Sequence, residues 1–314
     1  MPPKMPKNDV TRVAIVGATG LVGTSLYHIL DEKTYQISVV GRSRAKLRTN
    51  FRKAFNHLTW AEFKDSDARH YDVIINLAGA GVSDKKWTTE YKLVMVDSRI
   101  DATKMCTEKC RENPKIRLIN ASAVSAYGFY AGPSIRFDES NQAQRTGHAF
   151  LQDLIDKWEE TALEAEAYGS AVTLLRIGVV FHPDEGALPA MMQPFRYFIG
   201  GPVGSGQQMI SWISTQDLAR IMVFLISHPD ISGPVNCVSP GAVSNREFAQ
   251  TLGEAMRRPS VVTTPALVIR AAMGQMGDEL IVKGQHVYPQ KLIEAGFEFS
   301  YPNLRGYFSD HFGK

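Results

Sequence analysis

The sequence predicts an α/β protein with a doubly wound parallel sheet and a smaller C-terminal lobe. Short apolar runs rich in β-branched residues have the composition of strands buried on both faces, at residues 12–16, 36–40, 72–78, 116–121 and 171–177. Amphipathic helical stretches lie between several of them, at residues 21–30, 91–110 and 149–167. Strands that alternate with helices are joined by crossover connections, which makes the sheet parallel.

Length and charge limit the classes of function. The chain has 314 residues, enough for two domains or one large one, and its net charge of +3 is too small to suggest nucleic-acid binding. No apolar run approaches the roughly 18 residues of a membrane span, so no membrane partner is expected. The Pro- and Lys-rich start lacks the apolar core of a secretory signal. We therefore expect a disordered basic tail at residues 1–11 and a cytoplasmic protein.

The cysteines and histidines predict no disulfide framework and no metal site. Cys106, Cys110 and Cys237 are an odd number without framework spacing, which indicates a reducing compartment. The eight histidines form no metal-binding motif. We expect the thiols to be buried or half-buried.

The composition changes after about residue 180. A Gly- and Pro-rich stretch at 183–206 contains a predicted helix at 191–198. Further helices are predicted at 216–227, 245–257 and 265–283, with a short strand at 234–238. Asn245 is the expected N-cap of the helix at 245–257. We assign residues 12–180 to a nucleotide-binding domain and 181–314 to a substrate lobe at the carboxyl edge of the sheet.

A glycine-rich turn follows the first strand and opens the first helix, the context in which this motif is specific. Gly17 permits the tight turn, Gly20 lets the backbone approach a pyrophosphate, and Gly23 permits close packing of helix on strand. The helix N-terminus offers unpaired N–H groups to the phosphates. The pattern predicts a Rossmann dinucleotide site, with cofactor contacts from Gly17, Thr19, Gly20, Leu21, Val22 and Gly23.

The end of the second strand favours NADP(H) over NAD(H). An NAD site places Asp or Glu here to accept from the ribose 2′-hydroxyl. This chain has Arg42, Ser43 and Arg44 instead, and guanidinium groups bind phosphate oxygens bidentately. A solvated basic loop is the alternative interpretation.

Several further motifs resemble those of the extended short-chain dehydrogenases/reductases, and more narrowly the atypical epimerase-family branch (YfcH-like, or nucleoside-diphosphate-sugar epimerase-like). The resemblance covers about residues 13–307. Besides the glycine turn, it rests on residues 76–79 (NLAG), 98–100 (SRI), 120–128 (NASAVSAYG), 157–159 (KWE), 175–180 (LRIGVV), 200–206 (GGPVGSG), 211–218 (SWISTQDL) and 284–289 (GQHVYP).

This resemblance implies a Rossmann fold that binds NADP(H), with a C-terminal substrate lobe. It adds cofactor contacts from Leu77, Ala78, Gly79, Arg99, Ser122 and Ile177. It also suggests that Trp87, Gln207 and Trp212 line the substrate pocket, although each fits a packing role equally well.

The chain departs from the superfamily at the catalytic Tyr-x-x-x-Lys pair. With Glu159 as the glutamate that usually follows, the Tyr and Lys positions hold Leu151 and Ile155, which cannot transfer a proton. Both lie on the apolar face of the predicted helix at 149–167, so we expect them to pack in the core or against the nicotinamide side of the cleft. Ser122 and Tyr127 remain as candidate catalytic residues. The alternative is a hydroxyl at a strand end and a packed aromatic ring, because a phenol with a pKa near 10 is a poor base at neutral pH.

Two functions stay open from the sequence. The first is an NADP(H)-dependent oxidoreductase or epimerase that acts on a small hydroxylated substrate, with a nucleotide sugar as one example. The second is a non-catalytic NADP(H)-binding protein with a structural or redox-sensing role. A monomer or a homodimer is expected.

Overall fold

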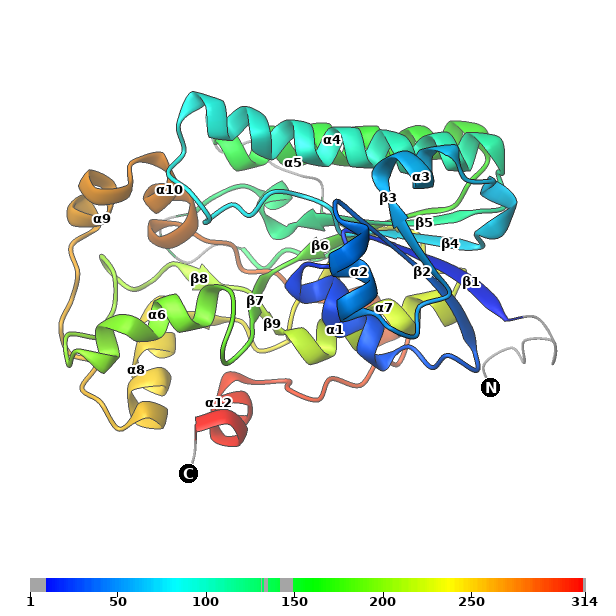
Figure 1. Ribbon diagram of the computed structural model, residues 1–314. Coiled ribbons are helices and arrows are strands. Elements are labelled where there is room, and N and C mark those ends of the chain that lie inside the picture. The colour runs from blue at the N-terminus through cyan, green and yellow to red at the C-terminus, as the bar shows by residue number, and fades with distance from the viewer. Residues whose placement is uncertain (1–9, 131, 133–134, 142–148, 313–314) are drawn as a thin grey trace.

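Seven parallel strands form the central sheet of the protein (Figure 1). The structure is a computed structural model that describes residues 10–130, 132, 135–141 and 149–312. The strand order β3-β2-β1-β4-β5-β6-β10 starts in the middle, at β1, and reverses between β1 and β4. This confirms the predicted doubly wound sheet and places the reversal, the usual ligand position in such sheets, at the glycine turn. The strands are β1 Thr11–Val16, β2 Tyr35–Gly41, β3 Asn56–Thr59, β4 Val73–Asn76, β5 Arg117–Ala123, β6 Val172–Ile177 and β10 Gly233–Cys237.

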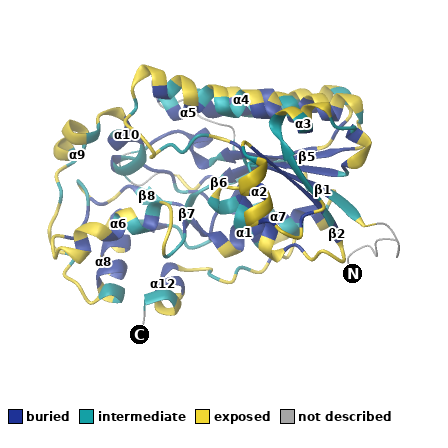
Figure 2. Ribbon diagram, in the orientation of Figure 1, coloured by how far each residue is buried: buried dark blue, intermediate teal, exposed yellow. Residues whose placement is uncertain are grey.

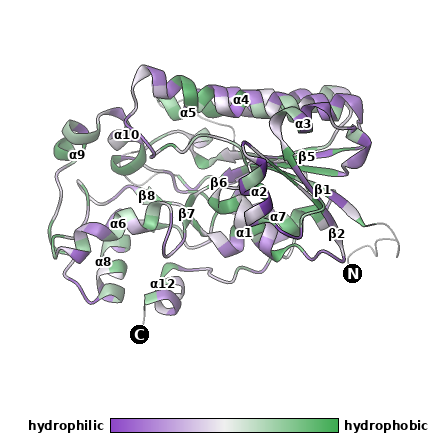
Figure 3. Ribbon diagram, viewed as in Figure 1, coloured by the Kyte–Doolittle hydropathy of each residue, from purple (hydrophilic) through white to green (hydrophobic). Residues whose placement is uncertain are grey.

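Helices cover both faces of the sheet. In Figure 1, α4 and α5 lie together over one face, and α1 and α7 pack against each other on the opposite face. Val13 and Ile15 of β1 contribute to the apolar core on the α1 and α7 side, whereas Ala14 and Val16 contribute to the core on the α4 side. This alternation is the two-residue period of a strand buried on both faces, and the sheet is buried throughout its centre (Figure 2) and largely hydrophobic (Figure 3). The helices are α1 Leu21–Ile29, α4 Thr89–Glu112, α5 Phe150–Leu163 and α7 Thr215–Ser227.

A smaller lobe with its own aromatic core stands at one end of the sheet. The rings of Phe181, Trp212, Phe248, Tyr307 and Phe308 pack on one another there. The elements of this lobe are β7 Val179–Phe181, α6 Ala187–Arg196, β8 Met209–Ile210, β9 Trp212–Ser214, β11 Val243–Ser244, α8 Asn245–Met256, α9 Ala266–Met273, α10 Gln275–Gly277, the π-helix η4 Asp278–Val282 and α12 Leu304–Phe312.

The predicted domain boundary at residue 180 does not match the structure. After β9 the chain returns to the sheet, because α7 packs against α1 and β10 pairs with β6 as the edge strand. Leu292, within α11 Gln290–Glu294, also belongs to the core under α1. The lobe is therefore built from segments on both sides of residues 215–237 rather than from one continuous C-terminal half.

Two predicted helix features are wrong. Ser244, not Asn245, is the N-cap of α8, because its hydroxyl accepts from the Glu247 amide, while the Asn245 side chain accepts from the Val203 amide. The predicted helix at 265–283 is interrupted at Gly274, which has a φ of +61° and separates α9 from α10. Several short elements were not predicted: α2 Arg44–Asn50, α3 Trp60–Asp65, and the 3₁₀ helices Ala68–His70, Val124–Tyr127 and Glu164–Tyr168.

Of the predicted tail, Thr11 already lies in β1, Val10 is exposed, and residues 1–9 are outside the described residues. Cys106, Cys110 and Cys237 are free and buried, as expected. No helix in the described part of the chain combines the length and the apolar character needed to cross a bilayer.

Candidate functional site

Two glycines of the turn after β1 are required by close backbone contacts. Gly17 has a φ of +80°, and a Cβ at this position would lie 2.9 Å from the backbone of Ala78 at the end of β4. A Cβ on Gly23 would lie 2.7 Å from the carbonyl oxygen of Ala18. A side chain at either position would push the turn from the sheet or the helix from the turn, so these glycines set the geometry of the site.

Gly20 has a different environment. A Cβ there would meet only the Gly17 carbonyl oxygen, at 3.6 Å, so its outer side is open. Gly20 is also the N-cap of α1, where no side chain accepts a hydrogen bond and the first turn holds no acidic residue. The amides of Leu21, Val22 and Gly23 lie within the first turn, where a helix offers them no acceptor. This end of α1 is suited to bind an anion such as a pyrophosphate.

The arginines after β2 have different partners. Arg44 pairs with Glu62 at 2.6 Å and donates from Nε to the carbonyl oxygen of His57. The Ser43 hydroxyl accepts from the Lys46 amide and caps α2. Arg42 is exposed and has no ion-pair partner among the described residues. Arg42 is therefore the arginine of this turn that is available to a phosphate.

Arg99 of α4 contributes a buried guanidinium beside the end of β4. It packs on Gly79, where a Cβ would come within 2.8 Å of its Cζ, and it donates from Nη1 to the carbonyl oxygens of Ala80 and Met95. Its Nε is buried without an acceptor in the described structure. Burial lowers the pKa of Arg99 to about 10, which leaves it charged at neutral pH. A buried donor without a partner is expected where a ligand supplies the acceptor.

The other predicted cofactor residues end neighbouring strands. Leu77 and Ala78 follow β4, and the Leu77 amide donates to Val16 of β1. Ile177, the last residue of β6, is half-buried between two apolar clusters. Thr19 is exposed in the glycine turn. Apart from Ser122, the predicted cofactor residues therefore gather at the carboxyl ends of β1, β2, β4 and β6.

Ser122 lies on β5, but its hydroxyl is already engaged. It donates to Oε1 of Glu159 on α5 at 2.5 Å. Glu159 in turn pairs with Arg176 of β6 through two hydrogen bonds of 2.9 and 2.8 Å. Ser122 is only 4% exposed. This position does not support the predicted catalytic role or cofactor contact of Ser122, and it points instead to a buried network that the sequence did not reveal.

Tyr127 belongs to the same network. Its side chain is fully buried, its hydroxyl donates to Oδ1 of Asn236 at 3.0 Å, and the Arg176 guanidinium lies 4.7 Å from the ring centre. Burial raises the pKa of Tyr127 further. A phenol enclosed in this way does not support the predicted role as proton donor and favours a packing role.

Leu151 and Ile155, at the positions of the missing Tyr and Lys, pack in apolar clusters. Leu151 contributes to a cluster with Phe129, and Ile155 lies with Trp158 beside α4. Neither side chain is on the surface, which agrees with the helix register that the sequence predicted.

An unpredicted residue, Glu279, caps the N-terminus of α5 from the C-terminal lobe. Its two carboxylate oxygens accept from the amides of Phe150 and Leu151, both at 2.9 Å. Gln275 also donates to it, at 2.7 Å. No sequence signal connects residues 128 positions apart, so only the structure identifies this cap.

The three predicted substrate residues are in different surroundings. Trp87 is half-buried against Phe150 and donates to the Val82 carbonyl oxygen. Gln207 is exposed, with its Oε1 near Gly132. Trp212 is fully buried in the aromatic core of the lobe and donates to Gly241. The prediction that Trp212 lines a substrate pocket is therefore corrected, because its indole fills the core.

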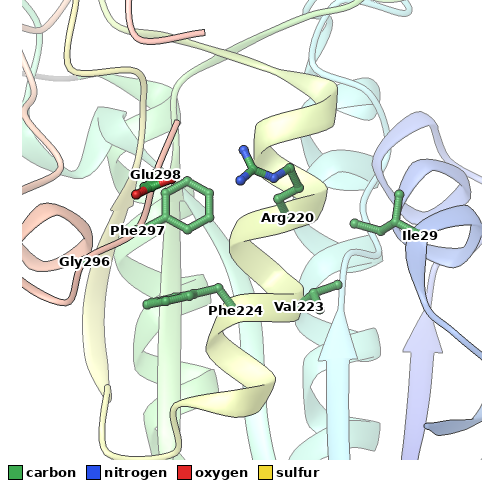
Figure 4. Close-up of a pocket in the computed structure, with 7 residues that line it drawn as sticks. All are labelled: Ile29, Arg220, Val223, Phe224, Gly296, Phe297 and Glu298. Carbon is green, nitrogen blue, oxygen red and sulfur yellow. The ribbon is translucent and has the colours of Figure 1, made fainter. Parts of the chain in front are cut away.

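A surface pocket elsewhere does not belong to this site. It is lined by Ile29, Arg220, Val223, Phe224, Gly296, Phe297 and Glu298 (Figure 4). Ile29 is the last residue of α1, whereas the glycine turn precedes its first residue. The pocket thus lies at the opposite end of α1 from the anion-binding turn, and its lining contains none of the predicted site residues.

Two family models match the chain. The model of the NAD dependent epimerase/dehydratase family matches residues 13–237, and a domain of unknown function (DUF1731) matches residues 264–310. The first match ends at the last residue of β10, in agreement with the return of the chain to the sheet.

Relatives match over nearly the whole chain. An epimerase family protein of Staphylococcus haemolyticus is 35% identical over 301 residues, which cover 94% of this chain and 97% of that protein. One of Mycobacterium tuberculosis is 34% identical, covering 93% and 94%.

Solved structures show the same architecture. The human epimerase family protein SDR39U1, crystallised with NADPH, superposes with a TM-score of 0.83 at 27% identity, covering 97% of this chain and 100% of that chain. A nucleoside-diphosphate sugar epimerase of Corynebacterium glutamicum superposes with a TM-score of 0.73 at 25% identity, covering 97% of this chain and 58% of that chain.

Proposed function

Because this chain belongs to the NAD dependent epimerase/dehydratase family, we propose that it binds NADP(H) on the glycine turn, with the 2′-phosphate at Arg42 and Ser43. One observation carries the preference for NADP(H): β2 is followed by Arg42, which is exposed and has no ion pair within the described chain, and the turn holds no carboxylate. A carboxylate there would accept from a ribose hydroxyl but would repel a phosphate. The NADPH found with the human relative supports the same choice.

The residues of the site fit this cofactor. The open side of Gly20 and the uncapped first turn of α1 would accept the pyrophosphate. The unsatisfied Nε of Arg99 would donate to an acceptor of the ligand beside Gly79. When bound, NADP(H) supplies or accepts a hydride, and the described residues at the strand ends would hold and orient it.

For the reaction, we propose hydride transfer to or from a small hydroxylated substrate, as in an oxidoreductase or an epimerase. The family match and the sugar epimerase named among the relatives support this class. With Leu151 and Ile155 in the Tyr and Lys positions and Tyr127 enclosed, the proton would be exchanged by the substrate itself, by solvent or by a residue outside this set.

A second candidate is an NADP(H)-binding protein without turnover, with a redox-sensing or structural role. The specific observation in its favour is the contrast within the site. The groups that would hold a dinucleotide are available, whereas the hydroxyls of Ser122 and Tyr127 are bonded to other side chains.

Turnover measurements distinguish the two candidates. Purified protein is incubated with NADPH and a panel of carbonyl compounds and nucleotide sugars, and cofactor oxidation and sugar epimerisation are followed. Reaction that Gly20→Val abolishes supports the enzyme. NADPH binding without any reaction supports the sensor, and absence of NADPH binding contradicts both.

The double variant Leu151→Tyr with Ile155→Lys examines the missing pair directly. Gain of carbonyl reduction would indicate that the site retains the geometry for hydride transfer and lacks only the proton-transfer pair. Ile155→Met is the matched control for packing, since a volume-conserving apolar change costs little, whereas an unpaired buried lysine costs several kcal/mol.

A further inference from the structure

The outer end of the C-terminal lobe carries a cluster of exposed apolar side chains. Residues 197–199 follow α6, residues 261–262 precede α9, and residues 267–268 lie on α9, where no residue is buried. In Figures 2 and 3, α9 is both exposed and hydrophobic. We call this set the apolar tip: Tyr197 (72% exposed), Phe198 (57%), Ile199 (57%), Val261 (81%), Val262 (42%), Leu267 (75%) and Val268 (53%).

The members of the apolar tip are held together by backbone contacts. The Val262 amide donates to the Gly200 carbonyl oxygen, and the Thr264 amide donates to Pro202. The Arg258 guanidinium lies 4.5 Å from the centre of the Phe198 ring. A Cβ on Gly204 would lie 3.4 Å from Ala266, the first residue of α9. The apolar tip is therefore one surface rather than scattered exposed residues.

Phe198 is held in an unusual backbone conformation. Its φ is +63°, a left-handed value that is rare for a bulky residue. Strained residues of this kind persist where the surrounding structure enforces them, and they concentrate at functional sites. Here the strained conformation displays an aromatic side chain to the outside.

The charged residues in the segments that carry the apolar tip are all basic. Residues 187–207 and 255–277 contain four arginines and no aspartate or glutamate. Arg270 pairs with Asp278, but Arg196, Arg257 and Arg258 have no ion pair among the described residues. The two acidic residues that adjoin residues 255–277 are already paired: Glu254 with Arg305, and Asp278 with Arg270 and Lys283. The apolar tip is thus bordered by uncompensated positive charge.

We propose that the apolar tip docks the protein on an anionic lipid bilayer. Surfaces that combine exposed aliphatic and aromatic side chains with arginines bind in the headgroup region, by apolar burial together with attraction to anionic lipids. Self-association through a two-fold axis would bring two copies of the same positively charged surface together, which charge repulsion disfavours. The sequence predicted no membrane partner because no segment can span a bilayer, but docking in the headgroup region needs no span. This inference is independent of the proposed cofactor site.

Co-sedimentation with lipid vesicles tests the proposal. The full chain is mixed with vesicles of phosphatidylcholine alone or with about one third phosphatidylserine, at low and high salt. We expect binding to the anionic vesicles that weakens with salt. Leu267→Gln with Val268→Gln should lower the binding constant at least roughly tenfold, because two apolar side chains lose their burial.

Control variants distinguish docking through the apolar tip from non-specific adsorption and from misfolding. Leu93→Gln with Val94→Gln, on α4, is the matched control, because these residues are also exposed (57% and 50%) but lie outside the apolar tip; it should bind vesicles like the parent protein. Phe198→Asn should weaken vesicle binding without loss of fold, since Asn tolerates left-handed φ. Arg196→Gln with Arg257→Asn should weaken it by about fivefold per arginine. NADPH affinity should be unchanged in all of these variants.

Four results would overturn the proposal. They are no binding to anionic vesicles, equal binding to neutral ones, the same loss in the α4 control, and a dimer in sedimentation velocity that the Leu267/Val268 variant dissociates. The last result would assign the apolar tip to a second copy of the chain.

Discussion

Two neighbouring parts of the same sheet edge differ in how their polar groups are used. At the β1 and β2 ends, the α1 amides are uncapped and Arg42 has no ion pair within the described chain. At the β5 and β6 ends, Ser122, Glu159 and Arg176 bond to one another, and Tyr127 is enclosed. At the β1 and β2 ends the hydrogen-bonding groups are available to a ligand, whereas at the β5 and β6 ends they are bonded within the protein and stabilise the fold. Under the proposed function, the groups that would hold the cofactor are available, whereas the positions of the proton-transfer pair belong to the core.

The largest expected effect concerns the β5 and β6 side. Glu159→Ala should lower the free energy of unfolding by about 3–5 kcal/mol, because it leaves the buried Arg176 guanidinium unpaired. Ser122→Ala, which removes one hydrogen bond, should cost only about 1 kcal/mol. Urea unfolding measures both.

Glu160→Ala is the control for that experiment. Glu160 is the next residue on α5 and is exposed, so its loss should change stability by less than about 0.5 kcal/mol. Equal effects of the two glutamates would show that the Glu159–Arg176 pair does not stabilise the fold.

The glycine turn should respond in the opposite way, with loss of binding and an intact fold. Gly20 has a φ of −77° and space for a side chain, so Gly20→Val should fold normally. The valine would occupy the place of the pyrophosphate, and NADPH affinity should fall by at least about 100-fold, or roughly 2.7 kcal/mol. Isothermal titration calorimetry measures the affinity, and circular dichroism checks the fold. Unchanged NADPH affinity in a folded variant would contradict the assignment of the pyrophosphate site to the glycine turn.

A smaller effect is expected where the lobe meets α5. Glu279→Ala should destabilise the protein by about 0.5–2 kcal/mol, the usual cost of a lost N-cap. Glu279→Gln keeps one accepting oxygen and should cost less. If urea unfolding shows that Ala and Gln are equivalent and neutral, the Glu279 cap does not hold the lobe to the sheet.

The contrast between the two parts also explains what the sequence predicted. The glycine turn, the arginine-bearing turn after β2 and the alternating strands are local patterns, and the structure reproduces the elements that carry them. The register that placed Leu151 and Ile155 on the apolar face of a helix was local too, and both side chains are buried.

The errors arose where an outcome depends on residues far apart in sequence. Trp212 was a candidate through the family resemblance and Tyr127 as a possible proton donor, but distant elements bury both side chains. The boundary at residue 180 missed the return of α7 and β10, since nothing local marks which sheet a later strand will join. The choice of Ser244 over Asn245 as N-cap and the break at Gly274 are one-residue decisions that tertiary contacts settle.

The comparison of NADPH and NADH affinities in the parent protein and in Arg42→Ala tests the central claim most directly. We expect the parent to bind NADPH more tightly, and Arg42→Ala to weaken NADPH by roughly 10- to 150-fold while NADH changes little. The lost bidentate contact to a phosphate corresponds to about 1.5–3 kcal/mol. Arg44→Ala should have a smaller effect, because Arg44 already pairs with Glu62. Equal affinity for the two cofactors, or equal weakening of both by Arg42→Ala, would contradict a 2′-phosphate site at the end of β2.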